Sequence, residues 1–301
     1  MKKIVVTGAS GFIGGYVCKY LFNTPQTEIY ACVRNGKTTP SDTAIQVEVD
    51  FLKEDFERLI ENIEPDIIIH TAALSQVDYC ELNRDEAWRV NVEATEKIAL
   101  VSKKVGARLV FLSSDFVFSG QNEFETEESA CSPVSFYGET KVAAERAIKR
   151  ILDNYAIVRP VLVYGIPLVE GRNNIVTMVK QNLEQQKPMN IVDDQFRTPI
   201  YVEDLADLIL ILCFSSEVGV FHAGGSEYLS VFDFALKTAQ FFELNTTLIS
   251  PIKSKDLAQT GSRPPKTRFD NSKVQRLFSF FSKNVDAGLA RIATQHPHGL
   301  K

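Results

Sequence analysis

The chain of 301 residues is long enough for one large domain, or a domain and a half, with a sizeable core. Hydrophobic residues make up 45% and charged residues 24%, the usual proportions of a globular protein. A net charge of −5, from 33 basic and 38 acidic residues, argues against nucleic acid or an anionic membrane surface as a partner. No apolar run is long enough for a membrane helix.

The N-terminus and the cysteines favour the cytoplasm. Residues 1–4 run directly into a strand pattern, without the apolar segment and small-residue cleavage site of a signal peptide. The cysteines are scattered and form no C-x-x-C pair: Cys18, Cys32, Cys80, Cys131 and Cys213. We therefore expect a cytoplasmic protein with reduced thiols, without a disulfide framework or a zinc site.

The first half of the chain alternates strand-like and helical patterns. Runs such as Ile67–Ile69 and Leu109–Leu112 are continuously apolar, which is typical of parallel strands buried on both faces. Strands are predicted at Lys3–Thr7, Glu28–Val33, Ile45–Val49, Asp66–His70, Arg108–Ser113 and Tyr155–Arg159, with helices near 12–23, 53–62, 84–105 and 136–151. This alternation predicts an α/β fold with a doubly wound parallel sheet, a Rossmann domain over residues 1–164.

Beyond residue 165 the pattern changes. Helical stretches at 172–186, 203–214 and 231–243 are separated by segments rich in Gly, Pro and Ser, and Val218–Ala223 has a strand pattern. We expect residues 165–301 to form mostly a smaller substrate-binding lobe, with some segments returning to the Rossmann core.

A glycine pattern directly after the first strand predicts a dinucleotide site. Gly8, Gly11 and Gly14 have the spacing G-x-x-G-x-x-G, between an apolar strand and a helical stretch. Glycines permit the tight turn, let backbone N–H groups approach a pyrophosphate and allow the helix to pack closely on the strand. The alternative is an ordinary strand–turn–helix connection.

The end of the second strand indicates which dinucleotide is bound. Arg34 stands where NAD-binding sites usually place an acid, and a guanidinium group suits the 2′-phosphate of NADP. We therefore favour NADP(H) over NAD(H), although a solvated loop arginine has the same sequence. Asp50 is a candidate for the adenine amino group or a surface cap. The predicted cofactor contacts are Gly8, Ser10, Gly11, Phe12, Ile13, Gly14, Arg34, Asp50, Phe51, Leu52, Thr71, Ala72, Ala73, Tyr137 and Lys141.

A second pattern predicts proton transfer beside the cofactor. Ser114 ends a buried strand, and Tyr137 and Lys141 are four residues apart, on one face of a helix. A nearby ammonium group and a positive nicotinamide ring favour the phenolate of a tyrosine and lower its pKa. Ser114 can then bind the carbonyl oxygen that gains or loses the proton. The alternative is an accidental Tyr–Lys pair on a helix surface.

These residues resemble the extended short-chain dehydrogenase/reductase superfamily over nearly the whole chain. Thr7–Gly14 matches its glycine motif, and Ser114, Tyr137 and Lys141 match its catalytic triad. The chain is most similar to the dTDP-4-dehydrorhamnose reductase (sugar-nucleotide reductase) branch. That similarity lies in Leu112–Gly120, Ser132-Pro133-Val134, Arg197–Ala206, Arg263-Pro264 and Phe269–Lys273.

The resemblance implies hydride transfer from the nicotinamide to a ketone carbon of a nucleotide-linked sugar. Tyr137 would donate the proton, Lys141 would hold the nicotinamide ribose, and Ser114 would bind the carbonyl oxygen. The substrate contacts it implies are Asp115 and Phe116 near the sugar, and Arg197 and Arg263 at a diphosphate. Guanidinium groups suit phosphate oxygens because they are permanently charged and forked; solvated loop arginines are the alternative.

Two departures from the branch qualify the resemblance. The branch has a tryptophan after the strand at Arg159, where this chain reads Arg159–Gly165 without one, so rhamnose specificity is in doubt. Its metal-binding glutamate near the glycine turn is also missing, since Gly15 and Tyr16 stand there, and we predict no metal.

Two other functions remain open. A nucleotide-sugar epimerase or dehydratase would keep NAD tightly bound and cycle the hydride. A non-catalytic regulatory subunit with a reductase fold would not need the matched Tyr137–Lys141 pair. In related proteins, helices corresponding to 84–105 and 136–151 pair across a two-fold axis, so a homodimer is plausible.

Overall fold

The computed structural model describes residues 1–34, 36–39, 44–50, 55–169 and 173–295. Phe51 and Leu52, predicted to contact the cofactor, lie outside the described residues.

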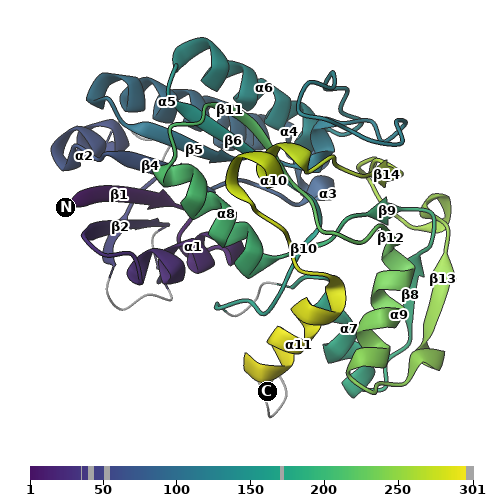
Figure 1. The fold of residues 1–301 in the computed structure, drawn as a ribbon. Coiled ribbons are helices and arrows are strands. Elements are labelled where there is room, and N and C mark those ends of the chain that lie inside the picture. Colours follow the sequence, from purple (N-terminus) through teal and green to yellow (C-terminus); the bar gives the residue numbers. More distant parts are fainter. Residues whose placement is uncertain (35, 40–43, 51–54, 170–172, 296–301) are drawn as a thin grey trace.

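A seven-stranded parallel sheet forms the centre of the molecule, in the order β11-β6-β5-β4-β1-β2-β3 (Figure 1). Its strands are β1 (Lys2–Thr7), β2 (Thr27–Val33), β3 (Ile45–Glu48), β4 (Ile67–His70), β5 (Arg108–Leu112), β6 (Tyr155–Pro160) and β11 (Gly219–Ala223). The chain adds strands on one side of β1 and then crosses to the other side with β4. The predicted doubly wound Rossmann sheet is therefore confirmed.

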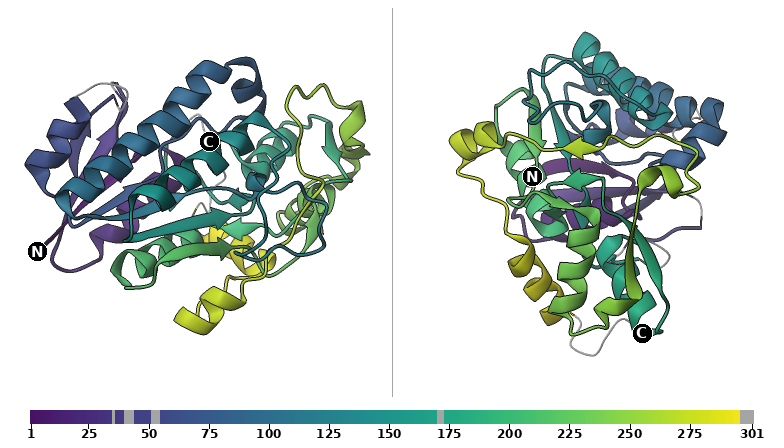
Figure 2. Two further views of the ribbon diagram at one scale, coloured as in Figure 1. Left: turned by 90° about the horizontal axis from the view of Figure 1, so that it is seen from above. Right: turned by 90° about the vertical axis from the view of Figure 1, so that its right-hand side faces the viewer.

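Helices cover both faces of this sheet, as Figures 1 and 2 show. One face packs against α1 (Phe12–Phe22), α8 (Val202–Phe214) and α10 (Ser272–Phe278), and the other against α2 (Asp55–Ile63), α5 (Ala94–Val105) and α6 (Phe136–Ile151). Neighbouring residues of a strand face opposite sides: Ile67 and Ile69 join the first core, and Ile68 the second. Burial on both sides explains why these strands are apolar at every position.

The stretch predicted as one helix over 84–105 is divided. A short α3 (Val77–Leu82) precedes α4 (Arg84–Trp88), and a π-helical turn at Arg89–Glu93 separates α4 from α5. The turn contains Asn91, which is 1% exposed and faces the interior. A buried amide that needs partners is a physical reason for the local change of helical pitch, and such turns are frequent at functional sites.

Most of the second half forms a smaller lobe, seen below and to the right of the sheet in Figure 1. Its helices are α7 (Ile175–Glu184) and α9 (Val231–Phe241), beside the parallel pair β8 (Met189–Val192) and β13 (Ile249–Ile252). Short strands β9 (Phe196–Arg197), β12 (Leu229–Ser230) and β14 (Lys266–Thr267) form a sheet of their own, and β7 (Val163–Tyr164) pairs with β10 (Ile200–Tyr201). Other segments of the second half contact the core, since β11 joins the main sheet and α8 packs on α1.

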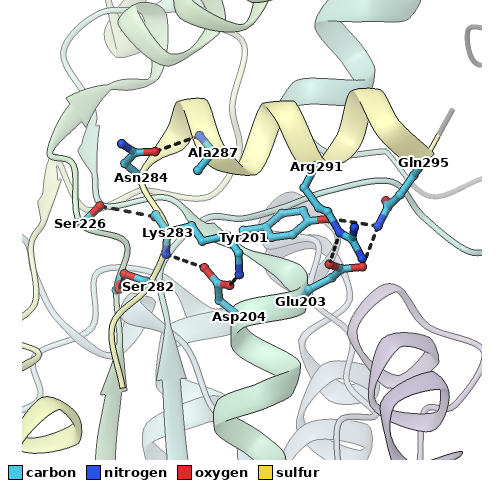
Figure 3. Close-up of polar contacts among 11 residues, drawn as sticks. Tyr201, Glu203, Asp204, Ser226, Ser282, Lys283, Asn284, Ala287, Arg291 and Gln295 are labelled. Atoms are coloured by element: carbon cyan, nitrogen blue, oxygen red, sulfur yellow. Dashed lines mark hydrogen bonds and ion pairs between the residues drawn. The ribbon is translucent and has the colours of Figure 1, made fainter. Parts of the chain in front are cut away.

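The C-terminal helix α11 (Val285–Gln295) is fastened to the start of α8 (Figure 3). Two side chains of α11 donate to Glu203: Arg291 Nε at 3.2 Å and Gln295 Nε2 at 2.6 Å. The Lys283 ammonium group, just before α11, pairs with Asp204. Both acids are buried, and they lie where the smaller lobe meets the sheet. The contacts therefore tie α11 to that junction.

Candidate active site

The glycine turn has the geometry that a phosphate cradle requires. Gly8 has φ +71°, and a Cβ added at Gly14 would lie 2.2 Å from the Gly8 carbonyl oxygen. Gly11 caps α1 without a side-chain hydrogen bond, and the first turn of α1 carries no acidic residue. The helix N-terminus is thus close to β1, positive in potential and suited to an anion.

The end of β4 lies directly beside this turn. Thr71 Oγ1 donates to the Thr7 carbonyl at 2.7 Å, and a Cβ on Gly8 would lie 2.8 Å from the Ala72 nitrogen. Thr71, Ala72 and Ala73 are partly buried. The structure therefore brings these predicted cofactor contacts together with the glycine turn.

Behind them His70 is buried and neutral. Its Nδ1 lies 2.7 Å from Thr7 Oγ1 and its Nε2 2.9 Å from Thr95 Oγ1. The Thr95 hydroxyl donates to the Asn91 carbonyl at 2.8 Å, so it accepts from His70 and the ring proton is on Nε2. Burial, together with the nearby Lys141 charge, lowers the pKa of His70 to about 3. His70 is therefore a packed residue at the end of β4.

Two other predicted cofactor residues, Arg34 and Asp50, lie at the ends of neighbouring strands. Arg34 is exposed directly after β2, where its charge acts on the phenol of Tyr79 from α3. Asp50 is exposed just past β3. Arg34 follows the carboxyl end of β2 and Asp50 that of β3, at the edge where open α/β sheets bind ligands.

The predicted catalytic residues come together at the neighbouring strand end. Ser135 caps α6 by accepting the Gly138 N–H at 3.2 Å, which starts the helix just before Tyr137. The Ser114 hydroxyl acts on the pKa of the Tyr137 phenol, and it donates to Asp115 Oδ1 at 3.2 Å. Lys141 Nζ donates to the Leu112 carbonyl at 2.8 Å. All of these catalytic side chains are less than a tenth exposed.

Burial dominates the electrostatics of this group. It raises the pKa of Tyr137 above its ordinary value, with the nearby Ser114 hydroxyl acting in the opposite direction. The lower pKa of Tyr137 that was expected from the Lys141 charge is therefore not seen, because the desolvation of the phenol has the larger effect. Burial also lowers the pKa of Lys141 to about 8, against the opposing charge of Glu145. At neutral pH the phenol is protonated and can act as an acid.

A buried ion pair that sequence reasoning missed lies one turn further along α6. Glu145 accepts from Arg159 Nε at 2.9 Å and Nη2 at 2.6 Å, and from Ser113 Oγ at 2.6 Å. Glu145 follows Lys141 by four residues, as Lys141 follows Tyr137, so the same helical spacing was available as a signal.

Asn91 is a second residue that was missed. Its side chain exchanges hydrogen bonds with the backbone of Leu74 at 2.8 and 2.9 Å, and it donates to Thr140 Oγ1 at 3.1 Å. It thus joins the loop after β4 to the helix of Tyr137 and Lys141. Nothing in the local pattern marks a polar residue inside a predicted helix as buried.

The residues predicted to orient the sugar lie next to Ser114. Phe116 packs edge-on against Tyr137, with ring centroids 5.6 Å apart. The buried carboxylate of Asp115 accepts from Thr267 Oγ1 at 2.7 Å and lies 3.8 Å from Arg197 Nε. Arg197 is 3% exposed, and its Nη2 donates to the Pro264 carbonyl at 2.7 Å.

Arg263, the other predicted diphosphate contact, pairs with an acid of α3. Its Nη1 and Nη2 donate to Asp78 Oδ1 and Oδ2 at 3.1 and 2.8 Å. The two arginines are close enough for the charge of Arg263 to act on the pKa of Arg197, which burial lowers. Each guanidinium group is already paired with a carboxylate, Arg197 with Asp115 and Arg263 with Asp78. Among the described residues there is no cluster of three or more His, Cys, Asp or Glu that could hold a metal, and no helix that could span a membrane.

Comparison with known proteins places this fold in a class. The solved structure of dTDP-4-dehydrorhamnose reductase from Bacillus anthracis, in complex with NADP, is 26% identical, with a TM-score of 0.87 over 98% of this chain and 99% of that one. The fold is thus that of the extended short-chain dehydrogenase/reductases, as the sequence resemblance predicted. The family model described as RmlD substrate binding domain matches residues 1–297, and the chain belongs to that family.

Curated relatives differ in their described roles. The spore coat polysaccharide biosynthesis protein SpsK of Bacillus subtilis (strain 168) is 28% identical over 83% of each chain. Methionine adenosyltransferase 2 subunit beta of Rattus norvegicus is 29% identical over 92% of this chain and 82% of its own. The chain is therefore similar both to a protein named for polysaccharide biosynthesis and to one named as a subunit of another enzyme.

Proposed function

We propose that this chain is an NADPH-dependent reductase of a keto group on a nucleotide-linked sugar. The observation that carries the proposal is the group formed by Ser114, Tyr137 and Lys141. These side chains lie together in a buried site at the carboxyl edge of the sheet. A protonated phenol near a serine hydroxyl suits proton delivery to a carbonyl oxygen.

The residues present fit a dinucleotide. Gly8, Gly11 and the N-terminus of α1 would hold the pyrophosphate, and Thr71–Ala73 would lie under the cofactor. Arg34 would bind the 2′-phosphate, which supports NADP(H) over NAD(H). The similar Bacillus anthracis structure contains NADP.

In this mechanism each residue has one task. The chemistry that a bound nicotinamide cofactor supplies is the hydride. Ser114 Oγ binds the carbonyl oxygen, and Tyr137 Oη donates the proton that completes the alcohol. Lys141, charged below pH about 8, holds the cofactor ribose. Arg197 and Arg263 would offer guanidinium donors to a diphosphate, and Asp115 and Phe116 would border the sugar.

A regulatory subunit is the second candidate, because the 29% identity to methionine adenosyltransferase 2 subunit beta is at least as high as that to the reductase structure. A binding role does not require a buried Tyr137–Lys141 pair. An epimerase or dehydratase that retains NAD remains the other catalytic alternative, and Arg34 argues against it. Homodimer formation and a cytoplasmic location stay predictions.

Replacing Tyr137 with phenylalanine tests the reductase proposal. The substitution removes the proton donor and leaves the ring, so we expect turnover to fall by roughly 10²–10⁴-fold while NADPH still binds. The measurement is oxidation of NADPH, and separately NADH, with 4-keto nucleotide sugars as substrates. Tightly bound NAD in freshly purified protein would instead favour the epimerase or dehydratase. Wild-type protein that oxidises neither cofactor would leave the regulatory role.

A further inference from the structure

Asp78 gathers a segment of the smaller lobe onto α3. Its Oδ1 accepts the backbone N–H groups of Thr260 and Gly261, each at 2.9 Å. The same carboxylate receives both Nη groups of Arg263, whose Nη1 also donates to the Gly261 carbonyl at 2.6 Å. A Cβ on Gly261 would lie 2.6 Å from Val77, so the backbone is in close contact with the helix. We call residues 260–267 the strap.

The other end of the strap is held beside Ser114. Arg197 donates to the Pro264 and Pro265 carbonyls at 2.7 and 3.4 Å, and Thr267 donates to Asp115. The strap therefore runs from α3 to the residue that follows Ser114. Val77, the neighbour of Asp78, packs in the same apolar cluster as Tyr137. Arg263 is thus held close to the wall of the catalytic site.

The stereochemistry of the Arg263 pair leaves one edge of the guanidinium group unused. Asp78 takes the end-on edge, one oxygen on each Nη. Within the described part of the chain, Nε and the second hydrogen of Nη2 donate to no protein group, and the side chain is 18% exposed. These two donors form the side-on edge, which can bind two oxygens of a phosphate in parallel. Arg263 can therefore hold Asp78 and an oxyanion at the same time.

We propose that Asp78 is a positioning residue that orients the side-on edge of Arg263 toward the diphosphate of the substrate. The inference rests on the proposed function. Asp78 is charged across the neutral pH range, because the Arg263 hydrogen bond holds the pKa of Asp78 at about 2. Asp78 neither touches the substrate nor takes part in proton transfer.

Two substitutions at Asp78 separate orientation of Arg263 from docking of the strap. In Asp78→Asn the side-chain oxygen can still accept from Thr260 and Gly261, but the amide group cannot accept from Arg263 Nη2. In Asp78→Ala both sets of contacts are lost. Glu61→Gln is the matched control, because Glu61 pairs with Lys104 at 2.7 Å on an exposed surface away from the site.

The experiment is calorimetric titration of the full chain with dTDP and with UDP, together with NADPH kinetics and hydrogen exchange. We expect Asp78→Asn to bind the better nucleoside diphosphate about tenfold more weakly, with kcat and the KM for NADPH within about twofold of wild type. Asp78→Ala should add faster exchange at residues 260–261. Glu61→Gln should change none of these.

Different outcomes separate the two proposals. Unchanged diphosphate affinity in Asp78→Asn, or an equal loss of NADPH affinity, would overturn the positioning role and leave the reductase intact. Wild-type protein that binds neither nucleoside diphosphate would also overturn it. Failure of the reductase proposal is recognised separately, by the absence of NADPH oxidation in wild type.

Discussion

At the scale of single residues, the site depends on charges that burial opposes. Lys141 is 3% exposed and yet must carry a charge to hold a ribose hydroxyl as proposed. Desolvation lowers its pKa to about 8, and only Glu145 and a cysteine act in the other direction. The Glu145–Arg159 pair is itself almost neutral overall, so it cannot restore the ordinary value.

This balance predicts an alkaline limit to activity. As pH rises through about 8, Lys141 loses its proton, and kcat/KM should fall by up to about tenfold per pH unit. The folded pKa lies below the unfolded one, so the stability cost of burying the charge is present below pH 8 and disappears as pH rises toward the unfolded value. The loss of activity should therefore occur without a loss of stability from this group.

The measurement is kcat/KM for NADPH oxidation between about pH 6 and about pH 10, with the melting temperature recorded at each pH. Lys141→Met should show low activity at every pH, without the fall in kcat/KM above about pH 8. A flat profile across pH 8 in wild type would contradict the assignment.

Site residues whose partners lie a few positions away in the sequence could be predicted. Residues whose partners are distant in the sequence could not. Tyr137 and Lys141 follow from helical geometry, and Ser114 from its place at a strand end. Asp78 could not be found, because its partner Arg263 is 185 positions away in the sequence. Nor did the sequence show that Arg197 is buried under Pro264, since an arginine in a loop reads as solvated.

At the scale of elements, close backbone contact at the glycine turn holds α1 against β1. The type and bounds of this strand–turn–helix unit were predicted closely, because the glycines and the apolar run are contiguous in the sequence. The break at Arg89–Glu93 was not predicted. It depends on Asn91 reaching Leu74 and Thr140 across the interior, which helical periodicity does not encode.

The close contact at Gly14 predicts that Gly14→Ala loses both stability and NADPH binding. The new methyl group would lie 2.2 Å from the Gly8 carbonyl oxygen, so α1 must move away from β1. We expect a loss of about 1–3 kcal/mol in the free energy of unfolding, as for an overpacked core, together with much weaker NADPH binding. Denaturant unfolding and fluorescence titration measure the two effects.

Gly288→Ala is the control for this prediction. Its methyl group would lie 2.0 Å from the Tyr164 hydroxyl, in α11 and away from the glycine turn. It should cost stability and leave NADPH affinity unchanged. Equal loss of affinity in both variants would show that general destabilisation, and not the turn, controls the cofactor site.

At the scale of the whole molecule, the two parts are joined by acids at the start of α8. The sequence predicted a division near residue 165 and segments that return to the core. It could not predict the fastening of α11, because the partners of Glu203 are 88 and 92 positions away. The same carboxylate lies 3.9 Å from Lys19 of α1, so one buried acid contacts α1, α8 and α11.

Glu203→Gln tests whether this junction holds the C-terminal helix. Arg291 and Lys19 are 56% and 48% exposed, so water can take over their charges and the loss falls short of that for a fully buried pair. We expect about 1–2 kcal/mol less free energy of unfolding, with faster hydrogen exchange across Val285–Gln295. Turnover should persist, because Tyr137 and Lys141 lie on α6, on the opposite face of the sheet from α8. Unchanged exchange in α11 would mean that its apolar contacts with the lobe, through Val285, Leu289 and Ile292, are sufficient to hold it.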